Sequence, residues 1–411
     1  HLGDTLASAL LANGVRLTGR SFKYHRPRGI LSAGSEEPNA LVELRTGARR
    51  EANAKATMVE VYDGLESFSQ NRWPSLKFDV MSVNSLLSPI FAAGFYYKTF
   101  MWPASLWEKL YEPAIRRAAG LGRASDVADP DRYEKVTAFC DVLVIGGGPA
   151  GLMAAVTAAR TGARVILADE NFMLGGRAID DASTIDDQPA ATWVASIEAE
   201  LAACQNLRII RRTTVFGTFD GGTYGAVERV TDYLSASPKG VPRQRLWRIV
   251  AQKAVLASGT TERPIVFGNN DRPGVMLAGA VRTYINRYGV LPGQRAVVFT
   301  NNDYGAATAR DLKRAGAEVV ALVDSRKGST DFMREIVRDV GCTLLDGAVV
   351  INARGAKQLK GAIVLKADGS SETFSCDLLA MSGGWNPNIQ LTTHLGGKPQ
   401  WNETLATFLS G

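Results

Sequence analysis

The sequence predicts an α/β protein with a parallel sheet, and two observations carry that prediction. From about residue 136 to the end, short apolar strand-like runs alternate with helix-like segments. Two segments, beginning at Asp141 and Ala296, each read as strand, turn, Ala-rich helix and second strand ending in an acid, which is the outline of a nucleotide-binding unit. The glycines of the two turns differ, and this difference carries the functional prediction.

Composition indicates a folded protein of a reducing compartment. The 411 residues are 45% apolar and 21% charged, and the net charge of +6 is spread without any block of like charges, which excludes a nucleic-acid or membrane-surface footprint. The longest apolar run, residues 142–159, is interrupted by Gly146-Gly147-Gly148-Pro149, so no membrane span is predicted. The four cysteines form no CxxC, which indicates neither disulfides nor a metal site and favours the cytoplasm. The chain opens at His1, as a fragment would.

Residues 1–135 are expected to form a separate N-terminal part. Asp4 as a cap and Gly14 as a stop predict an opening helix, and the runs ALVELR and ATMVEVYD predict strands. Burial is the default for the aromatic stretch that follows, but interface cores are rich in such residues, so a subunit interface sheltering a flavin is favoured. Its members are Phe91, Phe95, Tyr96, Tyr97, Phe100, Trp102, Trp107 and Tyr111. The charged residues 122–136 read as a linker, with a boundary near residue 135.

The first unit, DVLVIGGGPAGLMAAVTAARTGARVILADE, contains every part of a dinucleotide site. Gly146, Gly148 and Gly151 have GxGxxG spacing, which serves the tight turn, the approach of backbone to a pyrophosphate and the close packing of helix on sheet. Asp169 follows the second strand and is placed to accept a hydrogen bond from a ribose hydroxyl. Its carboxylate would repel a 2′-phosphate, so NAD or FAD is favoured over NADP.

Three later segments resemble further elements of the two-dinucleotide fold of flavin and pyridine-nucleotide oxidoreductases. MLGGRA resembles its GG element, AVLASGTTERP its A-T-G turn and MSGGWNPNI its return segment. We therefore expect a dinucleotide-binding domain of residues 136–265 and 375–411, interrupted by a second nucleotide-binding-like domain of residues 266–374. The candidate cofactor-binding residues are Gly146, Gly148, Pro149, Ala150, Gly151, Asp169, Glu170, Gly176, Arg177, Val215, Ala257, Ser258 and Gly259.

The second unit, AVVFTNNDYGAATARDLKRAGAEVVALVD, keeps the scaffold without the phosphate cradle. Thr300 and Asn302 occupy the first and third glycine positions, and only Gly305 remains. Their Cβ atoms take space that phosphate oxygens need, and Asp303 adds a carboxylate beside the would-be pyrophosphate. We expect one dinucleotide per chain and no hydride transfer between two. No catalytic residue is assigned, because the three histidines form neither a ligand cluster nor a Ser-His pair.

Strings spread over the whole chain resemble the α subunits of heterotetrameric sarcosine oxidases: GDTLASALLANGVRLTGRSFKYHRPRGILSAGSEEPNALVELR, NRWPSLKFDVMSVNSLLSPIFAAGFYYKTFMWP, DPDRYEKV and CDVLVIGGGPAGL. The resemblance implies an enzyme that oxidises sarcosine to glycine, reduces O2 to hydrogen peroxide, and releases formaldehyde or forms 5,10-methylenetetrahydrofolate. It implies NAD on this subunit, in the site where relatives of the fold hold FAD. It also implies FAD on the β subunit, where sarcosine is oxidised, FMN at the α/β interface, and small γ and δ subunits as partners.

The residues qualify two features that the resemblance implies. The N-terminal part is similar to a ferredoxin-like domain that holds a 2Fe-2S cluster through four cysteines in related amine and opine oxidases. Residues 1–139 contain no cysteine, so we expect this small α+β domain without its cluster. A folate-binding domain is implied after this segment, so folate binding is assigned to none of these residues. The loop KYHRPRG is expected to dock an acidic partner or a flavin phosphate, or to be a solvated loop.

Three hypotheses of different classes follow from the two turns and the resemblance. An NAD-holding subunit of a multi-subunit flavin amine oxidase, inactive by itself, is favoured. A self-contained FAD-dependent NADH oxidoreductase requires a nucleotide at the second turn despite Thr300 and Asn302. A non-catalytic assembly scaffold requires both sites to be vestigial.

Overall fold

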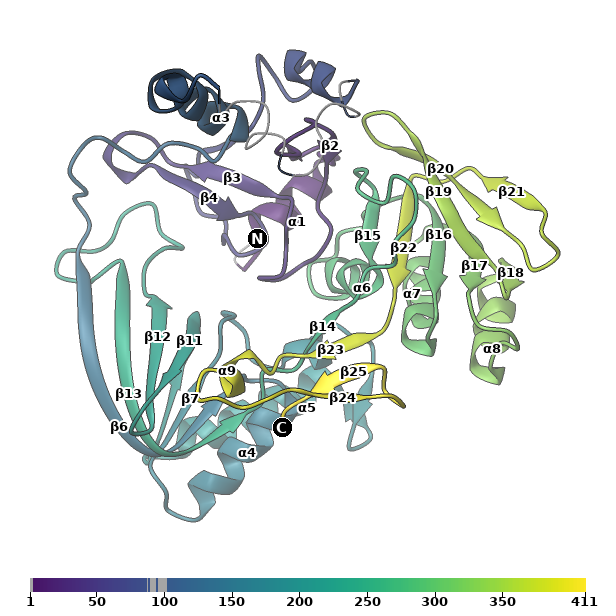
Figure 1. Cartoon of the computed structure of the whole chain (residues 1–411). Coiled ribbons are helices and arrows are strands. Elements are labelled where there is room, and N and C mark those ends of the chain that lie inside the picture. The colour runs from purple at the N-terminus through teal and green to yellow at the C-terminus, as the bar shows by residue number, and fades with distance from the viewer. Residues whose placement is uncertain (1–2, 87, 89–93, 95–101) are drawn as a thin grey trace.

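The computed structural model describes residues 3–86, 88, 94 and 102–411, and it shows two sheet-containing units below and beside a smaller N-terminal region (Figure 1). Of the aromatic stretch, Phe91, Phe95 to Tyr97 and Phe100 lie outside the described residues, whereas Trp102 is exposed. Among the helices of these described ranges, none combines the length and apolar character that crossing a membrane requires.

The N-terminal region begins with helix α1 (Leu6–Ala12), which is capped by the hydroxyl of Thr5 rather than by Asp4. The expected strand in ATMVEVYD is wrong. The carbonyl groups of Ala56 and Val59 accept hydrogen bonds from the first backbone N–H groups of α1, so this segment serves the helix end instead of a sheet. The other elements are β1 (Gly19–Arg20), β2 (Pro27–Arg28), β3 (Leu41–Leu44), β4 (Glu51–Lys55), β5 (Ser67–Ser69) and α3 (Glu112–Ala119). Strand β3 lies within the predicted run ALVELR, between β4 and β5.

The first unit is built on a six-stranded sheet of order β10-β7-β6-β13-β12-β11. Strands β10, β7, β6 and β13 are parallel, and β12 and β11 extend the sheet in antiparallel fashion. The elements are β6 (Tyr133–Ile145), α4 (Pro149–Arg160), β7 (Val165–Ala168), β8 (Thr184–Ile185), β9 (Gln188–Pro189), α5 (Ala190–Ala203), β10 (Leu207–Ile210), β11 (Thr213–Phe219), β12 (Thr223–Arg229) and β13 (Gln244–Leu256).

Alternate side chains of this sheet build two apolar cores, as the two-residue repeat of a strand requires. Val144 and Leu167 belong to the core under α4 and α5, whereas Leu143 and Ile166 belong to the core on the opposite face. Strands β6 and β7 therefore bury side chains on both faces of the sheet, which is typical of parallel strands.

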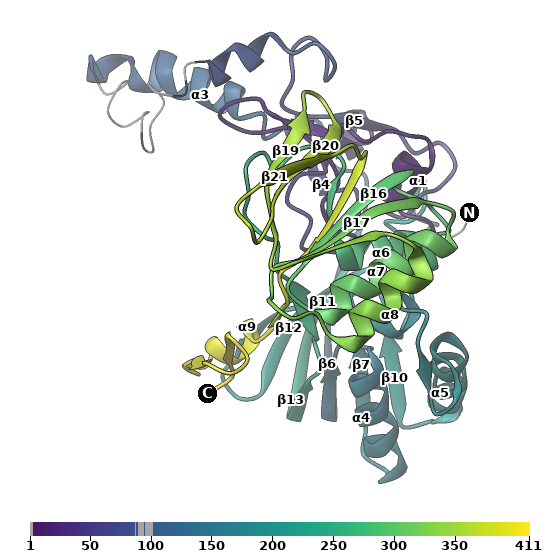
Figure 2. The same cartoon turned by 90° about the vertical axis from the view of Figure 1, so that its right-hand side faces the viewer.

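The second unit is built on a five-stranded parallel sheet of order β15-β22-β16-β17-β18. Helix α7 lies between α6 and α8 on one face of it (Figure 2). Strand β14 (Thr260–Glu262) leads from the first unit into this one, whose elements are β15 (Val275–Leu277), α6 (Ala278–Asn286), β16 (Arg295–Thr300), α7 (Asp303–Arg314), β17 (Glu318–Asp324), α8 (Asp331–Val340), β18 (Thr343–Asp346), β19 (Val349–Gly355), β20 (Leu359–Leu365), β21 (Ser371–Phe374) and β22 (Leu378–Ser382). The chain closes with β23 (Trp385–Pro387), α9 (Gln390–Thr393), β24 (Gln400–Asn402) and β25 (Thr407–Leu409).

Strand pairing differs from the expected domain boundaries at two places. Strand β6 begins at Tyr133 because it pairs with β13 from Gln244 onward, so the strand runs through the boundary expected near residue 135. Strand β22 pairs with β15 and β16, which places residues 378–382 in the second sheet rather than in the returning part that was expected to start at residue 375. The return to the first unit begins with β23, which pairs with β14.

Candidate nucleotide-binding site

The turn after β6 uses its three glycines in three ways. Gly146 has φ of +103°, and a Cβ there would lie 2.3 Å from the carbonyl oxygen of Ala257. A Cβ at Gly151 would lie 1.8 Å from the carbonyl oxygen of Gly146, so this glycine lets α4 pack on the turn. A Cβ at Gly148 would meet nothing within 4 Å. Gly146 and Gly151 are thus required by packing, whereas Gly148 faces open space.

The N-terminus of α4 is left open for an anion. Gly148 is the N-cap residue and provides no side-chain cap, and the first turn of the helix contains no acidic residue. The unpaired N–H groups and the positive end of the helix dipole therefore face the space beside Gly148 without an internal partner. A helix end of this kind is suited to a phosphate group.

Two acids follow β7 at the neighbouring strand end. The carboxylate of Asp169 accepts hydrogen bonds from the backbone N–H of Gly147 (2.6 Å) and of Asn171 (2.7 Å). Glu170 accepts from the hydroxyl of Ser35 (2.9 Å), which belongs to the N-terminal region. Burial raises the pKa of both carboxyls, and the hydrogen bonds that they accept oppose that shift.

The remaining predicted segments close around the same turn. Gly176 packs on it, because a Cβ there would lie 3.1 Å from the Cα of Gly148. The guanidinium group of Arg177 stacks on the ring of Trp385, 3.4 Å from its centroid, and donates to the hydroxyl of Tyr304 (3.3 Å). The turn at Ala257–Gly259 follows β13, the other strand beside β6.

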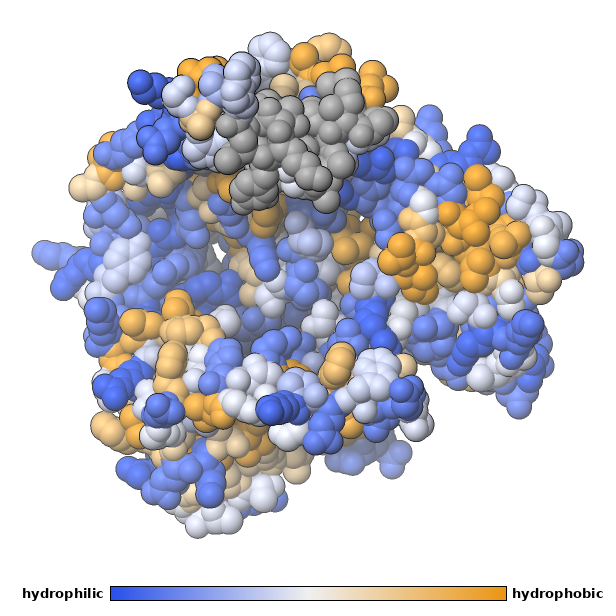
Figure 3. Space-filling view, viewed as in Figure 1, coloured by the Kyte–Doolittle hydropathy of each residue, from blue (hydrophilic) through white to orange (hydrophobic). Residues whose placement is uncertain are grey.

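These segments surround a cavity of about 670 Å³. The face seen in Figure 3 is hollowed between the N-terminal region and the six-stranded sheet. Every predicted site residue lines the cavity except Gly151, which is buried behind the turn. The carboxyl ends of β7, β6 and β13 lie side by side, so Asp169, Gly146 and Ala257 occupy one edge of the sheet. This edge is where ligands bind in open parallel sheets.

Other walls of the cavity come from residues that sequence analysis did not identify. The loop at residues 33–36 covers it from the N-terminal region, and one face of α6 lines it together with β14 and residues that follow β23. The added residues that matter chemically are Glu36, Glu262, Thr283, Arg287, Asn388 and His394. No local sequence pattern marks most of these residues, because they reach the cavity through long-range packing. The exception is Glu262, whose position just after the A-T-G-like turn could have indicated it.

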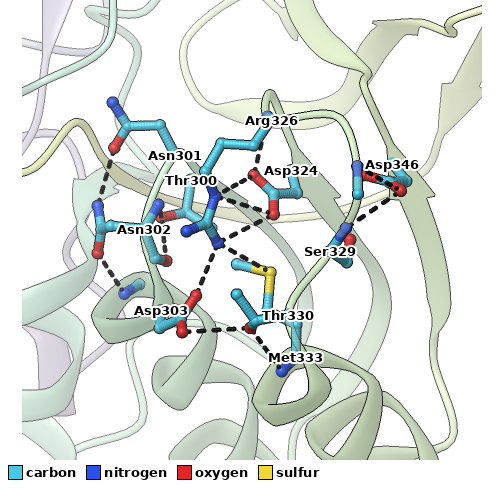
Figure 4. A network of polar contacts seen from close by, with 12 residues as sticks. Thr300, Asn301, Asn302, Asp303, Asp324, Arg326, Ser329, Thr330, Met333 and Asp346 are labelled. Carbon is cyan, nitrogen blue, oxygen red and sulfur yellow. Dashed lines mark hydrogen bonds and ion pairs between the residues drawn. The ribbon is translucent and has the colours of Figure 1, made fainter.

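The turn after β16 is closed by its own side chains (Figure 4). The side-chain oxygen of Asn302 accepts from the backbone N–H of Gly305 (2.9 Å) and so caps α7. The buried hydroxyl of Thr300 lies within hydrogen-bond distance of the carbonyl oxygens of Asn302 (2.9 Å) and Ser382 (3.2 Å) and can donate to either. The helix end that receives a phosphate in a nucleotide-binding unit is satisfied internally here.

The two acids beside this second turn, Asp303 and Asp324, both form ion pairs with Arg326. Arg326 donates to Asp303 (2.7 Å) at the start of α7 and to the buried Asp324 (3.1 Å) at the end of β17 (Figure 4). The hydrogen bonds to Asp324 raise the pKa of Arg326. Thr330 donates to the second oxygen of Asp303 (3.2 Å). The first turn therefore leaves its helix end without a side-chain cap, whereas the second satisfies its helix end with its own side chains.

The loop KYHRPRG is held within the chain. Arg26 and Arg28 both pair with Asp271, at 2.6 and 2.5 Å. His25 is buried, and its Nδ1 lies 2.7 Å from the carboxylate of Asp79. These internal partners engage Arg26, Arg28 and His25, three of the residues that were expected to face an acidic partner or a flavin phosphate or to be solvated.

The chain is similar over nearly its whole length to proteins named sarcosine oxidase subunit alpha. It is 57% identical over 408 residues to the protein of Rhizobium meliloti (strain 1021) and 40% identical over 422 residues to that of Corynebacterium sp. (strain U-96). Each match covers 99% of this chain but 41% and 38% of the relative, so the chain spans about two-fifths of the length of these curated relatives. The resemblance to sarcosine oxidase α subunits is confirmed.

Two family models and one solved structure support the fold. Residues 1–72 match a 2Fe-2S iron-sulfur cluster binding domain, and residues 141–259 match an FAD dependent oxidoreductase family. The crystal structure of L-proline dehydrogenase from P. horikoshii superposes with a TM-score of 0.64 at 19% identity, over 100% of this chain and 62% of that one. The fold class, a two-dinucleotide fold preceded by a ferredoxin-like domain, is confirmed. The first cysteine of the sequence, Cys140, follows the matched ferredoxin-like residues.

Proposed function

From its similarity to sarcosine oxidase alpha subunits, we propose that this chain is the nucleotide-holding part of the alpha subunit of a flavin-dependent sarcosine oxidase, with NAD in the cavity at Gly146–Gly151. The contrast between the two turns supports this proposal: the first leaves a helix end and an open cavity, whereas the second fills both with its own side chains. One dinucleotide per chain is the occupancy that follows.

The proposed reaction takes place largely outside this chain. The enzyme would convert sarcosine, O2 and water into glycine, formaldehyde and hydrogen peroxide, or transfer the one-carbon unit to tetrahydrofolate as 5,10-methylenetetrahydrofolate. We place sarcosine oxidation at FAD on a β subunit, FMN at the interface between α and β, and γ and δ subunits in the same complex. The sequence resemblance supports these assignments, and the chain is expected to be inactive by itself.

The residues of the first turn would bind and orient the dinucleotide. The backbone at Gly148 leaves room for the pyrophosphate, and the uncapped start of α4 offers N–H groups to its oxygens. Asp169 keeps lone pairs free after its two backbone hydrogen bonds and would accept from the adenosine ribose. Glu170 and Glu36 add negative charge to the cavity wall, which disfavours a 2′-phosphate. When bound, NAD supplies a nicotinamide ring that accepts hydride.

The nucleotide released from the intact complex tests the proposal. After acid denaturation, mass spectrometry should find NAD in a ratio of about one per copy of this chain, and the chain purified without partners should oxidise no sarcosine. A complex that is active but releases no NAD would contradict the proposed occupancy. Turnover of sarcosine by the isolated chain would contradict the assignment of the chemistry to a partner.

FAD in the same cavity is the second candidate, and the match of residues 141–259 to an FAD dependent oxidoreductase family favours it. NAD and FAD share the ADP half that the first turn would hold, so the turn itself accepts both. The isolated chain distinguishes them: a yellow chain that releases FAD on denaturation supports FAD. A colourless chain that releases NAD supports the first candidate.

A further inference from the structure

A carboxyl group with an unpaired oxygen lies in the wall of the cavity. Glu262, the last residue of β14, is 5% exposed. Its Oε2 accepts a hydrogen bond from the backbone N–H of Gly279 (2.8 Å) in the first turn of α6, whereas its Oε1 is buried and has no hydrogen-bond partner of ordinary geometry among the residues that the structure describes. An unpaired buried carboxyl oxygen is costly in a native structure, so it calls for a partner that arrives from outside the chain.

The order of the strands places Glu262 at one end of the cavity. Asp169 follows β7 and Ala257 follows β13, and these strands lie on opposite sides of β6, which leads into Gly146. In a nucleotide-binding unit the acid after the second strand receives the adenosine ribose, and the glycine turn receives the phosphates. The other half of the dinucleotide therefore lies on the Ala257 side. Strand β14, with Glu262, follows directly on this side.

The side chains of Glu262, Trp385 and Arg177 converge on Gly279. A Cβ on Gly279 would lie 2.7 Å from Oε2 of Glu262, 3.2 Å from the ring of Trp385 and 3.4 Å from Nη1 of Arg177. Burial raises the pKa of Glu262 to about 7, and the negative charge of Glu36 adds to the rise. Hydrogen bonding by the Ser382 hydroxyl and the Gly279 N–H, together with the positive charge of Arg177, acts to lower this pKa. Arg177 is itself engaged by Trp385 and Tyr304. Arg177 therefore does not pair with Oε1 of Glu262.

We propose that Glu262 binds the carboxamide of the nicotinamide ring, its ionised Oε1 accepting a hydrogen bond from the carboxamide N–H beside the cationic ring. This inference rests on the proposed occupancy by NAD and adds the residue that recognises its non-adenosine half. Because the ionised form is the one that binds, NAD uptake releases a proton. With a pKa of about 7 in the free protein, the affinity for NAD should rise about tenfold from pH 6 to pH 8.

Calorimetric titration of the nucleotide-depleted protein tests this with two ligands, NAD and ADP-ribose, which lacks the nicotinamide ring. In the wild type, NAD affinity should rise with pH and ADP-ribose affinity should not. In Glu262→Gln, NAD should bind about tenfold more weakly at pH 8 and the pH dependence should disappear, with ADP-ribose unchanged. The matched control Glu170→Gln alters the same residue type at the adenosine end and should affect NAD and ADP-ribose equally.

Loss of both ligands in Glu262→Gln to the same extent, or a pH dependence that persists in this variant, would overturn the role of Glu262 while leaving the proposed NAD site intact. If the wild type binds ADP-ribose but not NAD, or binds neither, the proposed function fails and this inference with it.

A measurement on the wild type alone guards against a variant that folds poorly. Nicotinic acid adenine dinucleotide has a carboxylate in place of the carboxamide, and an ionised Glu262 would repel it. At pH 8 it should bind at least about tenfold more weakly than NAD, and the difference should shrink at pH 6 where Glu262 is protonated. Equal affinity for the two dinucleotides at pH 8 would overturn the proposal.

Discussion

The two turns of this chain share their spacing and their scaffold but treat the same helix end in opposite ways. After β6, the N-cap position of α4 is Gly148, which has no side chain and faces a cavity. After β16, the N-cap position of α7 is Asn302, whose side chain bonds to the helix N–H that a phosphate would otherwise meet. The comparison shows that the second turn differs from the first in two respects: its helix donors are satisfied within the chain, and side chains fill the space beside them.

The glycine that survives in both turns explains why the scaffold persists. A Cβ at Gly305 would lie 2.2 Å from the hydroxyl of the buried Thr300, much as one at Gly151 would strike Gly146. These glycines serve the packing of helix on sheet and are needed whether or not a ligand binds. The glycine positions that hold other residues in the second turn are the first and the third, at Thr300 and Asn302.

The largest effect is expected from copying the second turn into the first. Gly148→Asn should lower NAD affinity at least about 100-fold, because its side chain enters the cavity and caps α4 as Asn302 caps α7. The free energy of unfolding should stay within about 1 kcal/mol of the wild type. Titration calorimetry and urea unfolding measure the two effects.

The control for this change is Gly162→Asn, the same substitution just beyond the other end of α4. Gly162 has a positive φ of +83° and open space around it, and asparagine tolerates this conformation. It should leave NAD affinity unchanged. Undiminished NAD binding by Gly148→Asn would contradict the assignment of the phosphates to this turn.

A smaller effect is expected from the packing glycine that both turns share. Gly151→Ala and Gly305→Ala should each lower the free energy of unfolding by about 1–3 kcal/mol, because the added Cβ meets atoms that cannot move freely. Gly148→Ala, whose Cβ enters open space, is the matched control and should be close to neutral in stability. If Gly305→Ala were neutral too, packing would not explain why this glycine remains.

Removing the cap of the second turn should affect stability but not nucleotide binding. Asn302→Ala deletes the hydrogen bond to Gly305 and should lower the free energy of unfolding by about 1 kcal/mol. The amount of NAD bound per chain should not change, since the proposed site is at the other turn. A loss of NAD in this variant would contradict the assignment of the nucleotide to the first turn alone.

The smallest effect is expected from restoring the glycines alone. The double variant Thr300→Gly and Asn302→Gly should gain no measurable NAD binding at the second turn, because Arg326 still joins Asp303 and Asp324 across it. Binding of a second NAD by this variant, seen as a second step in the titration, would show that the glycines alone determine whether the second turn binds a nucleotide.

Much of the first site was predictable from the sequence because its residues follow one another along the chain. The GxGxxG spacing, the small-residue helix and Asp169 define a strand–turn–helix–strand unit whose geometry is local. Its residues line one cavity in the structure, apart from Gly151. The sequence predicted that Asn302 excludes phosphate by its steric bulk. The structure adds that its side chain caps α7.

The parts that escaped prediction depend on contacts between distant segments. Glu262, Arg287 and the loop at residues 33–36 reach the cavity from three different elements, and no periodicity marks them. The wrong strand at ATMVEVYD has the same origin: its alternating pattern suits a strand, but α1 takes its carbonyl groups. The membership of β22 in the second sheet is likewise set by pairing with β16, which lies about 80 residues earlier.

Native mass spectrometry of the nucleotide-depleted protein titrated with NAD tests the contrast between the turns most directly. The account predicts that a single NAD binds per copy of this chain at saturation and that Gly148→Asn abolishes it. Two NAD molecules per chain, or a single one that survives Gly148→Asn and disappears in Asn302→Ala, would contradict it.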